Sequence, residues 1–138
     1  MIHYKTNSQL PFTAILDLYV SVGWSNYTNH PQHLEQAFHQ SLFVMAAYDD
    51  EELVGLIRAV GDGVSIVFIQ DLLVHPSYQR QGIGRSLLQQ TLEKFEDVYQ
   101  IQLATEQSDK NLAFYQGNGF HRQEDFDCTG MIYAPDKK

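Results

Sequence analysis

The most constraining feature of this chain is the run of residues 64–74, in which apolar side chains fill both the odd and the even positions. Successive side chains of a strand face opposite sides of a sheet, so this run is typical of a central strand that is covered on both faces. Asp71 interrupts the run. An ionised carboxylate in an apolar interior costs several kcal/mol unless it is paired, hydrogen-bonded or shifted in pKa. We therefore expect a layered sheet with one charged group that needs a partner.

The chain before this run predicts an antiparallel meander preceded by helices. Turn residues separate the strand-like runs, and Pro11 precedes a helical spacing of apolar residues. The expected elements are a strand at residues 2–5, a helix with Phe12, Ile15, Leu16, Tyr19 and Val20 on its buried face, a short helix after Pro31, and strands at residues 42–48 and 53–60.

After residue 74 the pattern changes to alternating helices and strands. We expect a helix from about 82 to 95, a strand at 101–105, a helix from about 109 to 116, and two short strands near Phe120 and at residues 131–133. The fold class that follows is α/β, with a mixed, mostly antiparallel central sheet and flanking helices. The length of 138 residues and the absence of a linker-like stretch predict a single domain over residues 1–138.

Charge and composition exclude several partners. Nine Lys and Arg against seventeen Asp and Glu give a net charge of −8, which opposes binding to nucleic acid and favours cationic small molecules. No apolar run approaches the ~20 residues that a bilayer requires, and no signal peptide is visible, so we expect a cytoplasmic protein without membrane contact. Cys128 is the only cysteine and has no intrachain disulfide partner; we expect a packed thiol.

A glycine-rich loop follows the central strand, within a stretch from Leu72 to Leu92 that contains no carboxylate. Gly82 and Gly84 stand there between Arg80 and Arg85, directly before a helical pattern. Glycines let the main chain approach a ligand closely, and the first amides of a helix attract anions. The loop is therefore predicted to bind an anion such as a pyrophosphate.

Two common phosphate motifs do not fit this loop. A P-loop requires glycine where Gln79 stands and lysine where Arg85 stands. A dinucleotide fingerprint requires a small third residue where Leu87 stands.

The spacing Gln79-x-x-Gly82-x-Gly84 instead resembles the Q/R-x-x-G-x-G/A motif with which GNAT acetyltransferases bind coenzyme A. The resemblance covers nearly the whole chain, because residues 71–76 and 113–120 are also similar to signatures of that superfamily, in the same order. It implies acetyl-CoA as co-substrate, with main-chain groups of Leu72, Leu73 and Val74 along the pantetheine arm and acetyl carbonyl. The implied pyrophosphate ligands are the amides of Gln79, Arg80, Gln81, Gly82, Ile83, Gly84 and Arg85.

The same resemblance implies that Ser108 and Phe114 lie beside the cofactor. Many members carry Asn seven residues before the catalytic tyrosine, and this chain has Ser108 there, which weakens the assignment of Ser108.

Acetyl transfer to an amine requires an acid for the leaving thiolate and a base for the ammonium. The resemblance implies that Tyr115 is the acid; its alternative is core packing. Asp71 is the first candidate for the base, and the alternative is an ion pair with Arg58. His75 is the second candidate, and its alternative is a loop residue without a catalytic role.

The acceptor is expected to be a primary amine of a small molecule. Residues 21–24, the stretch 71–81 and Gly130-Met131 resemble a subgroup that includes plastid arylalkylamine acetyltransferases, which suggests an aromatic amine. The expected acceptor-binding residues are Trp24, Tyr27 and Phe126, each of which also fits core or surface. A peptide or protein acetyltransferase and a non-catalytic acyl-CoA-binding module are the alternatives. No metal is expected, and frequent dimers in the family make a homodimer plausible.

Overall fold

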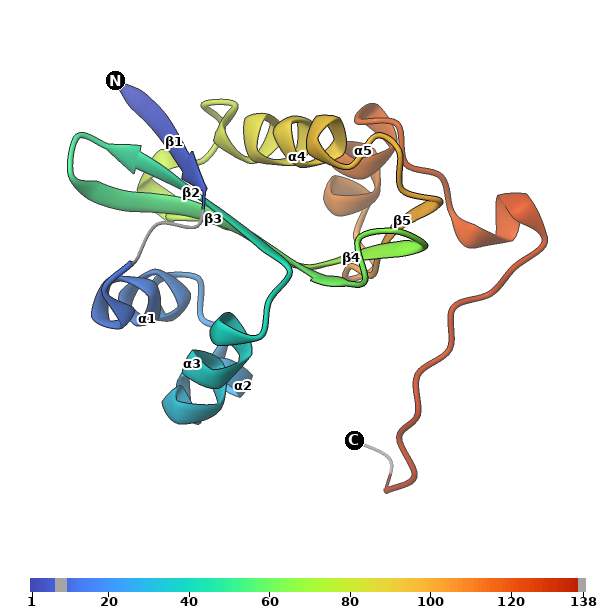
Figure 1. Ribbon diagram of the computed structural model, residues 1–138, viewed down its shortest axis with the longest axis horizontal. Helices are drawn as coiled ribbons and strands as arrows, with labels where there is room; N and C mark the ends of the chain where they lie inside the picture. Colours follow the sequence, from blue (N-terminus) through green and yellow to red (C-terminus); the bar gives the residue numbers. More distant parts are fainter. Residues whose placement is uncertain (7–9, 137–138) are drawn as a thin grey trace. The chain divides into compact units, whose positions relative to one another are not determined.

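The computed structural model describes residues 1–6 and 10–136 and divides the chain into two compact units, Met1–Ala104 and Thr105–Lys138 (Figure 1). The expectation of a single domain over residues 1–138 stays a prediction.

A five-stranded sheet in the order β1-β2-β3-β4-β5 forms the first unit. Its first four strands are antiparallel neighbours, and the last one runs parallel to β4. The strands are β1 (Ile2–Thr6), β2 (Phe43–Asp49), β3 (Glu52–Gly61), β4 (Ile66–Val74) and β5 (Gln100–Leu103). The predicted meander and the mixed, mostly antiparallel sheet are confirmed.

Helices cover both faces of this sheet (Figure 1). On one face lie α1 (Phe12–Ser21), α2 (Ser25–Thr28) and α3 (Pro31–His39), and on the other lies α4 (Ile83–Lys94). Among the described residues, no helix has the length and apolar character needed to cross a bilayer.

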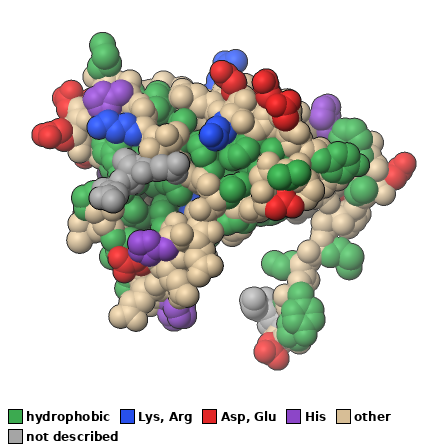
Figure 2. All heavy atoms as spheres, viewed as in Figure 1, with side chains coloured by type: hydrophobic (Ala, Val, Ile, Leu, Met, Phe, Trp, Pro, Cys, Tyr) green, Lys and Arg blue, Asp and Glu red, His purple; other side chains and the backbone are tan. Residues whose placement is uncertain are grey.

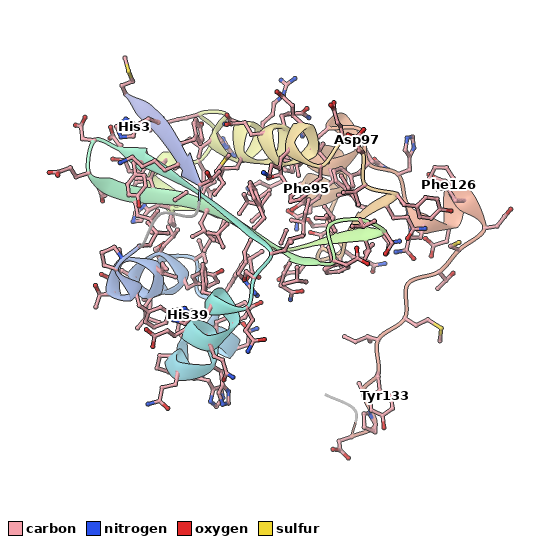
Figure 3. All side chains as sticks on the ribbon, viewed as in Figure 1. His3, His39, Phe95, Asp97, Phe126 and Tyr133 are labelled. Carbon is pink, nitrogen blue, oxygen red and sulfur yellow. The ribbon has the colours of Figure 1, made fainter. Side chains whose placement is uncertain are left out.

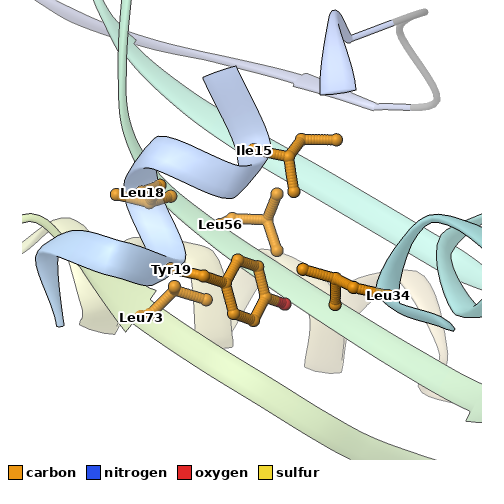
Figure 4. Close-up of a cluster of buried hydrophobic side chains, with 6 residues drawn as sticks. All are labelled: Ile15, Leu18, Tyr19, Leu34, Leu56 and Leu73. Atoms are coloured by element: carbon orange, nitrogen blue, oxygen red, sulfur yellow. The ribbon is translucent and has the colours of Figure 1, made fainter. Parts of the chain in front are cut away.

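The core between α1, α3 and the sheet is a cluster of buried side chains (Figure 4). Its members are Ile15, Leu18, Tyr19, Leu34, Leu56 and Leu73. The prediction that Val20 lies on the buried face of α1 is wrong, because Val20 is 58% exposed and Leu18 is 2% exposed. The other four predicted positions, Phe12, Ile15, Leu16 and Tyr19, do lie in or against this cluster.

On the other face, α4 approaches the sheet closely at Gly55 of β3. A Cβ atom at Gly55 would lie 3.0 Å from Cγ2 of Ile83 and 3.4 Å from Cδ1 of Leu87. Ile83, Leu87 and Leu88 are almost completely buried. A residue without a side chain on β3 therefore lets the start of α4 pack down on the sheet, which fixes where the glycine loop ends.

The second unit contains α5 (Asp109–Gly117) and a short 3₁₀ turn at Gln123–Phe126. Neither of the two C-terminal strands predicted near Phe120 and at residues 131–133 is present among the described residues. The amide of Phe120 instead donates to the carbonyl of Tyr115 over 3.0 Å, which closes the end of α5. Both predictions are wrong for this chain, because a strand-like pattern forms a strand only where a partner strand accepts it.

Candidate functional site

A β-bulge in β4 determines where Asp71 points. Arg58 of β3 pairs with Asp71 and the next residue, Ala59, pairs with Ile69, so Gln70 is an extra residue in β4. Arg58 and Ala59 face opposite sides of the sheet, and cross-strand partners share a face. Ile69 and Asp71 therefore face opposite sides, although they are two residues apart. The bulge turns Asp71 toward the face that carries α1, α2 and α3.

On that face Asp71 accepts hydrogen bonds at both carboxylate oxygens. Oδ2 receives Nε of Arg58 and the hydroxyl of Tyr19, each over 2.9 Å, and Oδ1 receives the hydroxyl of Tyr27 over 2.8 Å. Asp71 and Arg58 are each 4% exposed. The interpretation in which Asp71 pairs with Arg58 is confirmed, and its role as a base stays a prediction.

Arg58 is held by further contacts on the same face. Its NH1 group donates to the hydroxyl of Ser41 over 3.2 Å, and its guanidinium lies 5.6 Å from the ring centre of Phe38. Burial alone would lower the pKa of Arg58, but the charge and hydrogen bond of Asp71 raise it above its usual value. Arg58 is therefore a permanent cation, neutralised by Asp71.

The two tyrosines that contact Asp71 keep their protons at neutral pH. Burial, followed by the charge of Asp71, raises the pKa of Tyr19 well above its ordinary value. Burial also raises the pKa of Tyr27, against a lowering contribution from its hydrogen bond with Gln70. Both hydroxyls thus remain donors to the carboxylate.

An aromatic cluster surrounds this polar network. The ring of Tyr19 lies 5.9 Å from Trp24 and 5.2 Å from Tyr27, edge to face in both cases, and Trp24 lies 6.3 Å from Tyr27. Trp24 and Tyr27 are half-buried, so part of each ring faces solvent. The structure therefore brings two predicted acceptor-binding residues together with Asp71. Tyr19, which helical spacing placed among core residues, belongs to the network through its hydroxyl, and no sequence signal separated the two roles.

At the glycine loop, main-chain amides at the start of α4 are left without a side-chain cap. Gly82 has a φ of 81° and stands as N-cap of α4, where no side chain caps the helix. Gln79, Arg80, Gln81 and Arg85 are exposed, and Ile83 is buried. The first amides of a helix have no partner within the helix, so this end of α4 offers donors to an anion.

The end of β4 next to this loop also offers main-chain groups. Pairing between β4 and β5 ends at Ile69 and Leu103. The amide of His75 donates to the carbonyl of Val54 on β3 over 2.8 Å. Because main-chain groups alternate sides along a strand, those of Leu72 and Val74 face away from β3, on the side where β5 no longer pairs. The carbonyl of Val74 accepts Nε2 of Gln79 over 3.2 Å.

His75 and Tyr78 hold the first part of the loop. Nδ1 of His75 accepts the amide of Ser77 over 3.1 Å, which is the contact expected of a loop residue. The hydroxyl of Tyr78 donates to Oδ2 of Asp49, at the β2–β3 turn, over 2.8 Å. The Tyr78 bond ties the loop to the sheet before its glycines begin.

In the second unit, Tyr115 lies on α5 between two other rings. Its ring is 5.0 Å from that of Phe114 and 5.9 Å from that of Phe120. Burial raises the pKa of Tyr115 above its usual value. Ser108 caps α5 by accepting the amide of Asn111 over 3.1 Å, so its hydroxyl has a structural use.

Two other residues of the second unit lie on its surface. Phe126 is 67% exposed, and its ring contacts that of His121 at 5.6 Å (Figure 3). The expectation of a packed thiol is wrong: Cys128 is exposed, because it follows the 3₁₀ turn in a segment without regular structure. Among the residues described, no three His, Cys, Asp or Glu side chains gather as metal ligands.

The sequence and the fold of this chain are similar to those of known proteins. The family model described as "Acetyltransferase (GNAT) domain" matches residues 16–131. The chain therefore belongs to the GNAT acetyltransferase family, whose co-substrate is acetyl-CoA, and it is an acetyltransferase.

Individual relatives support the same assignment. A GNAT-family acetyltransferase structure from Streptococcus pneumoniae is 49% identical, with a TM-score of 0.88 over 97% of this chain and 98% of that one. An uncharacterised N-acetyltransferase, ycf52, from Gracilaria tenuistipitata var. liui is 28% identical over 97% of this chain and 74% of its own length. The "GCN5-related N-acetyltransferase 1, chloroplastic" of Arabidopsis thaliana is 31% identical over 58% of this chain and 40% of its own length.

Proposed function

We propose that this acetyltransferase moves the acetyl group of acetyl-CoA directly to a primary amine of a small molecule, in the first instance an aromatic amine. The observation that carries the proposal is the half-buried pair Trp24 and Tyr27 beside the buried carboxylate of Asp71. Aromatic rings attract ammonium groups and pack against flat hydrocarbon rings. The net charge of −8 adds a general attraction for cations.

The glycine loop and the end of β4 are the proposed cofactor site. The amides from Gln79 to Arg85 would bind the pyrophosphate, with Gly82 and Gly84 giving it access to the main chain. The main chain of Leu72, Leu73 and Val74 would lie along the pantetheine arm. This placement of the pantetheine arm is supported by the side of β4 that no longer pairs with β5 beyond Ile69.

Tyr115 is the proposed general acid. The amine nitrogen attacks the thioester carbonyl, a C–N bond forms and the C–S bond breaks. The phenol of Tyr115 gives its proton to the thiolate of coenzyme A, and the proton that the nitrogen loses on becoming an amide returns to the phenolate of Tyr115. The raised pKa of Tyr115 supports this role, because it keeps the phenol protonated at neutral pH.

Asp71 is the proposed base, acting through Tyr27. Both oxygens of Asp71 are occupied and its side chain is 3% exposed, so an amine does not reach it directly. The hydroxyl of Tyr27 donates to Asp71, and its oxygen accepts long bonds from NH2 of Arg58 and Nε2 of Gln70, each over 3.4 Å. An ammonium would displace one of these two long bonds. A proton would pass from the amine to Tyr27 while the proton of Tyr27 passes to Asp71. His75 is the second candidate, through the ring nitrogen that Ser77 does not use.

A peptide or protein acceptor is the competing proposal within the same chemistry. Its support is a relative from Glycine max named "Histone acetyltransferase TAP1", 29% identical over 63% of this chain and 35% of its own length. Ser108, Phe114 and Phe126 remain proposed ligands of the cofactor or the acceptor.

The test measures release of free thiol from acetyl-CoA with a panel of arylalkylamines, aliphatic polyamines and lysine-containing peptides. We expect kcat/KM for the best arylalkylamine to exceed that for any peptide by about tenfold or more, which corresponds to ~1.4 kcal/mol of transition-state binding. A peptide as the preferred acceptor would replace the proposal with its competitor.

The acid is tested with Tyr115→Phe, with Tyr99→Phe as the matched control because Tyr99 is 81% exposed in the first unit. We expect kcat to fall by about 10²- to 10⁴-fold in Tyr115→Phe, while the Kd for coenzyme A, measured by calorimetry, changes less than about twofold. Equal losses in kcat and in affinity would show that Tyr115 has a structural role instead.

A further inference from the structure

Gln70 is the extra residue of the β-bulge in β4, and it is exposed while both of its neighbours along the strand are buried. Its Nε2 group donates to the hydroxyl of Tyr27 over 3.4 Å. That bond is long, and Tyr27 is already held by Asp71 over 2.8 Å. Gln70 is therefore not required to keep Tyr27 in place, which leaves its side chain available to a ligand.

The position of Gln70 along β4 brings it close to both proposed substrate sites. Pairing between β4 and β5 ends at Ile69, so Gln70 is the first residue of β4 beyond this pairing. Leu72, the first of the residues proposed to lie along the cofactor, is two residues further, which is about 7 Å along a strand. Gln70 also contacts Tyr27, one of the proposed acceptor-binding rings. A group that binds Gln70 therefore lies within reach of the thioester and of the aromatic rings.

The hydrogen bonds of Tyr27 determine which end of the Gln70 amide is left for a ligand. A phenol has one proton, and that of Tyr27 goes to Oδ1 of Asp71. The Tyr27 oxygen can therefore only accept from Gln70, so the NH2 group of the amide faces Tyr27 and the carbonyl oxygen Oε1 does not. In the part of the chain that the structure describes, no protein group donates to Oε1. Gln70 thus offers an uncharged acceptor to a ligand that carries N–H groups.

A primary ammonium fits this acceptor well. It carries three N–H groups and a positive charge, which the faces of Trp24 and Tyr27 attract. Of the two long bonds at the Tyr27 oxygen, that of Arg58 comes from a buried residue and that of Gln70 from an exposed one. An ammonium that displaces the Gln70 bond can donate one N–H to Tyr27 and another to Oε1 of Gln70.

The net charge of the chain does not by itself select this place. On the face of the molecule shown in Figure 2, acidic side chains are dispersed over the surface and form no single patch. Their attraction for cations is long-ranged and screened by salt, so it raises the rate of encounter without selecting a site. Selection of the amine therefore depends on local donors and acceptors, and Oε1 of Gln70 is such an acceptor.

We propose that Gln70 is a specificity-determining residue, whose Oε1 accepts an N–H of the reacting primary amine beside Tyr27. This inference rests on the proposed function, in which the acceptor is a primary amine. Once the ammonium has given up one proton, the neutral amine still has two N–H groups. Gln70 can keep one of them, and the lone pair of the nitrogen is then free to attack the thioester carbonyl.

The experiment uses Trp24 as a probe of amine binding, because it is the only tryptophan of the chain and its ring lies 6.3 Å from that of Tyr27. Its fluorescence is followed while 2-phenylethylamine is added to the protein with coenzyme A present, so that binding is measured without turnover. We expect the Kd to rise at least about tenfold in Gln70→Leu, as for a lost hydrogen bond to a charged group. Gln36→Leu is the matched control, because Gln36 is exposed on α3, and its Kd should change less than about twofold.

Two further measurements separate the acceptor oxygen from other roles of Gln70. Gln70→Glu keeps acceptor oxygens and loses the NH2 group, so it should bind 2-phenylethylamine at least as tightly as the unmodified chain. Trimethyl(2-phenylethyl)ammonium keeps the charge and the ring but has no N–H, and its Kd should change less than about twofold in Gln70→Leu. Circular dichroism checks that each variant remains folded.

The role of Gln70 would be overturned, with the proposed function left standing, if Gln70→Leu left the Kd for 2-phenylethylamine unchanged or raised it equally for both ligands. Equal weakening in Gln70→Leu and Gln70→Glu would also overturn it, because the NH2 group and its bond to Tyr27 would then be responsible. No binding to the unmodified chain up to about 10 mM would overturn both the role of Gln70 and the proposed aromatic amine.

Discussion

The glycine loop and the Asp71 network, formed by Asp71, Arg58, Tyr19 and Tyr27, differ in where their polar groups lie. In the loop, Gln79, Arg80, Gln81 and Arg85 are exposed, and the donors that we propose for an anion are main-chain amides. In the network, the charges of Asp71 and Arg58 sit on side chains that are 4% exposed, and tyrosine hydroxyls complete the set of hydrogen bonds.

This difference predicts two kinds of sensitivity. Main-chain donors stay in place when exposed side chains change, so the loop depends on its backbone conformation. A buried charge depends on every partner, because each lost partner leaves an unpaired group in a low dielectric. Substitutions in the network should therefore lower stability in addition to removing the proposed base, and substitutions at loop glycines should act mainly on cofactor affinity.

The largest effect is expected for Asp71→Leu, which leaves the guanidinium of Arg58 without its carboxylate. Removing one partner of a buried ion pair costs about 3–5 kcal/mol, and we expect a loss of that size in the free energy of unfolding. Urea denaturation followed by circular dichroism measures it.

Two companions sharpen this first comparison. Asp97→Leu removes an exposed carboxylate (Figure 3) and should change the free energy of unfolding by less than about 0.5 kcal/mol. The pair Arg58→Met with Asp71→Leu removes both charges and should recover a large part of the loss. If the double variant is no more stable than Asp71→Leu alone, the unpaired cation is not the cause.

The next largest effect is expected for a substitution at Gly82, with the same substitution at Gly23 as its control. Both have a left-handed φ, 81° and 77°, and a Cβ would meet no atom within 4 Å at either position. Alanine at each should cost about 1 kcal/mol of stability through backbone strain. Only Gly82→Ala should also raise the Kd for coenzyme A, by about tenfold, because its Cβ would stand where the ligand meets the main chain. Calorimetry measures the Kd, and equal affinities in the two variants would argue against a pyrophosphate at this loop.

The sequence predicted the regular parts of this molecule and missed the irregular ones. Alternation and helical spacing located the meander and α4, because both patterns report which side chains are buried over several residues. The bulge at Gln70 left no such trace, since an extra residue in a strand looks the same in sequence as a regular one. Without it, Asp71 could not be placed on the face of Tyr19.

In the candidate site, too, some residues could be predicted from the sequence and others could not. Gly82 and Asp71 were found because a glycine beside a helix start and a charge in an apolar run are local anomalies. Tyr19 was assigned only to the core, because a ring that packs and a hydroxyl that binds a carboxylate belong to one residue. The strand at residues 131–133 was predicted from a pattern that records propensity and carries no information about the partner.

The smallest change in stability and in coenzyme A affinity is expected for a side chain that holds the glycine loop. Tyr78 is the candidate, since its hydroxyl donates to Asp49 at the β2–β3 turn. That bond lowers the pKa of Asp49 below its usual value of 3.8, and Asp49 in turn raises the pKa of Tyr78 to about 12. A carboxyl with a lowered folded pKa adds stability above its unfolded pKa, and this stability is lost as the pH falls through the folded pKa. A phenol with a raised pKa adds stability below about pH 10, and it is lost as the pH rises through about 12.

Tyr78→Phe should therefore lower the Tm slightly at neutral pH, and the difference from the unmodified chain should vanish as the pH falls through the lowered folded pKa of Asp49. Scanning calorimetry across pH measures this difference, and Tyr99→Phe should show none at any pH. A rise of up to about threefold in the Kd for coenzyme A, smaller than that of Gly82→Ala, would show that one surface bond helps to hold the loop. A larger rise in this Kd than that of Gly82→Ala would contradict the difference between loop and network. The loop would then depend on its side chains, as the network does.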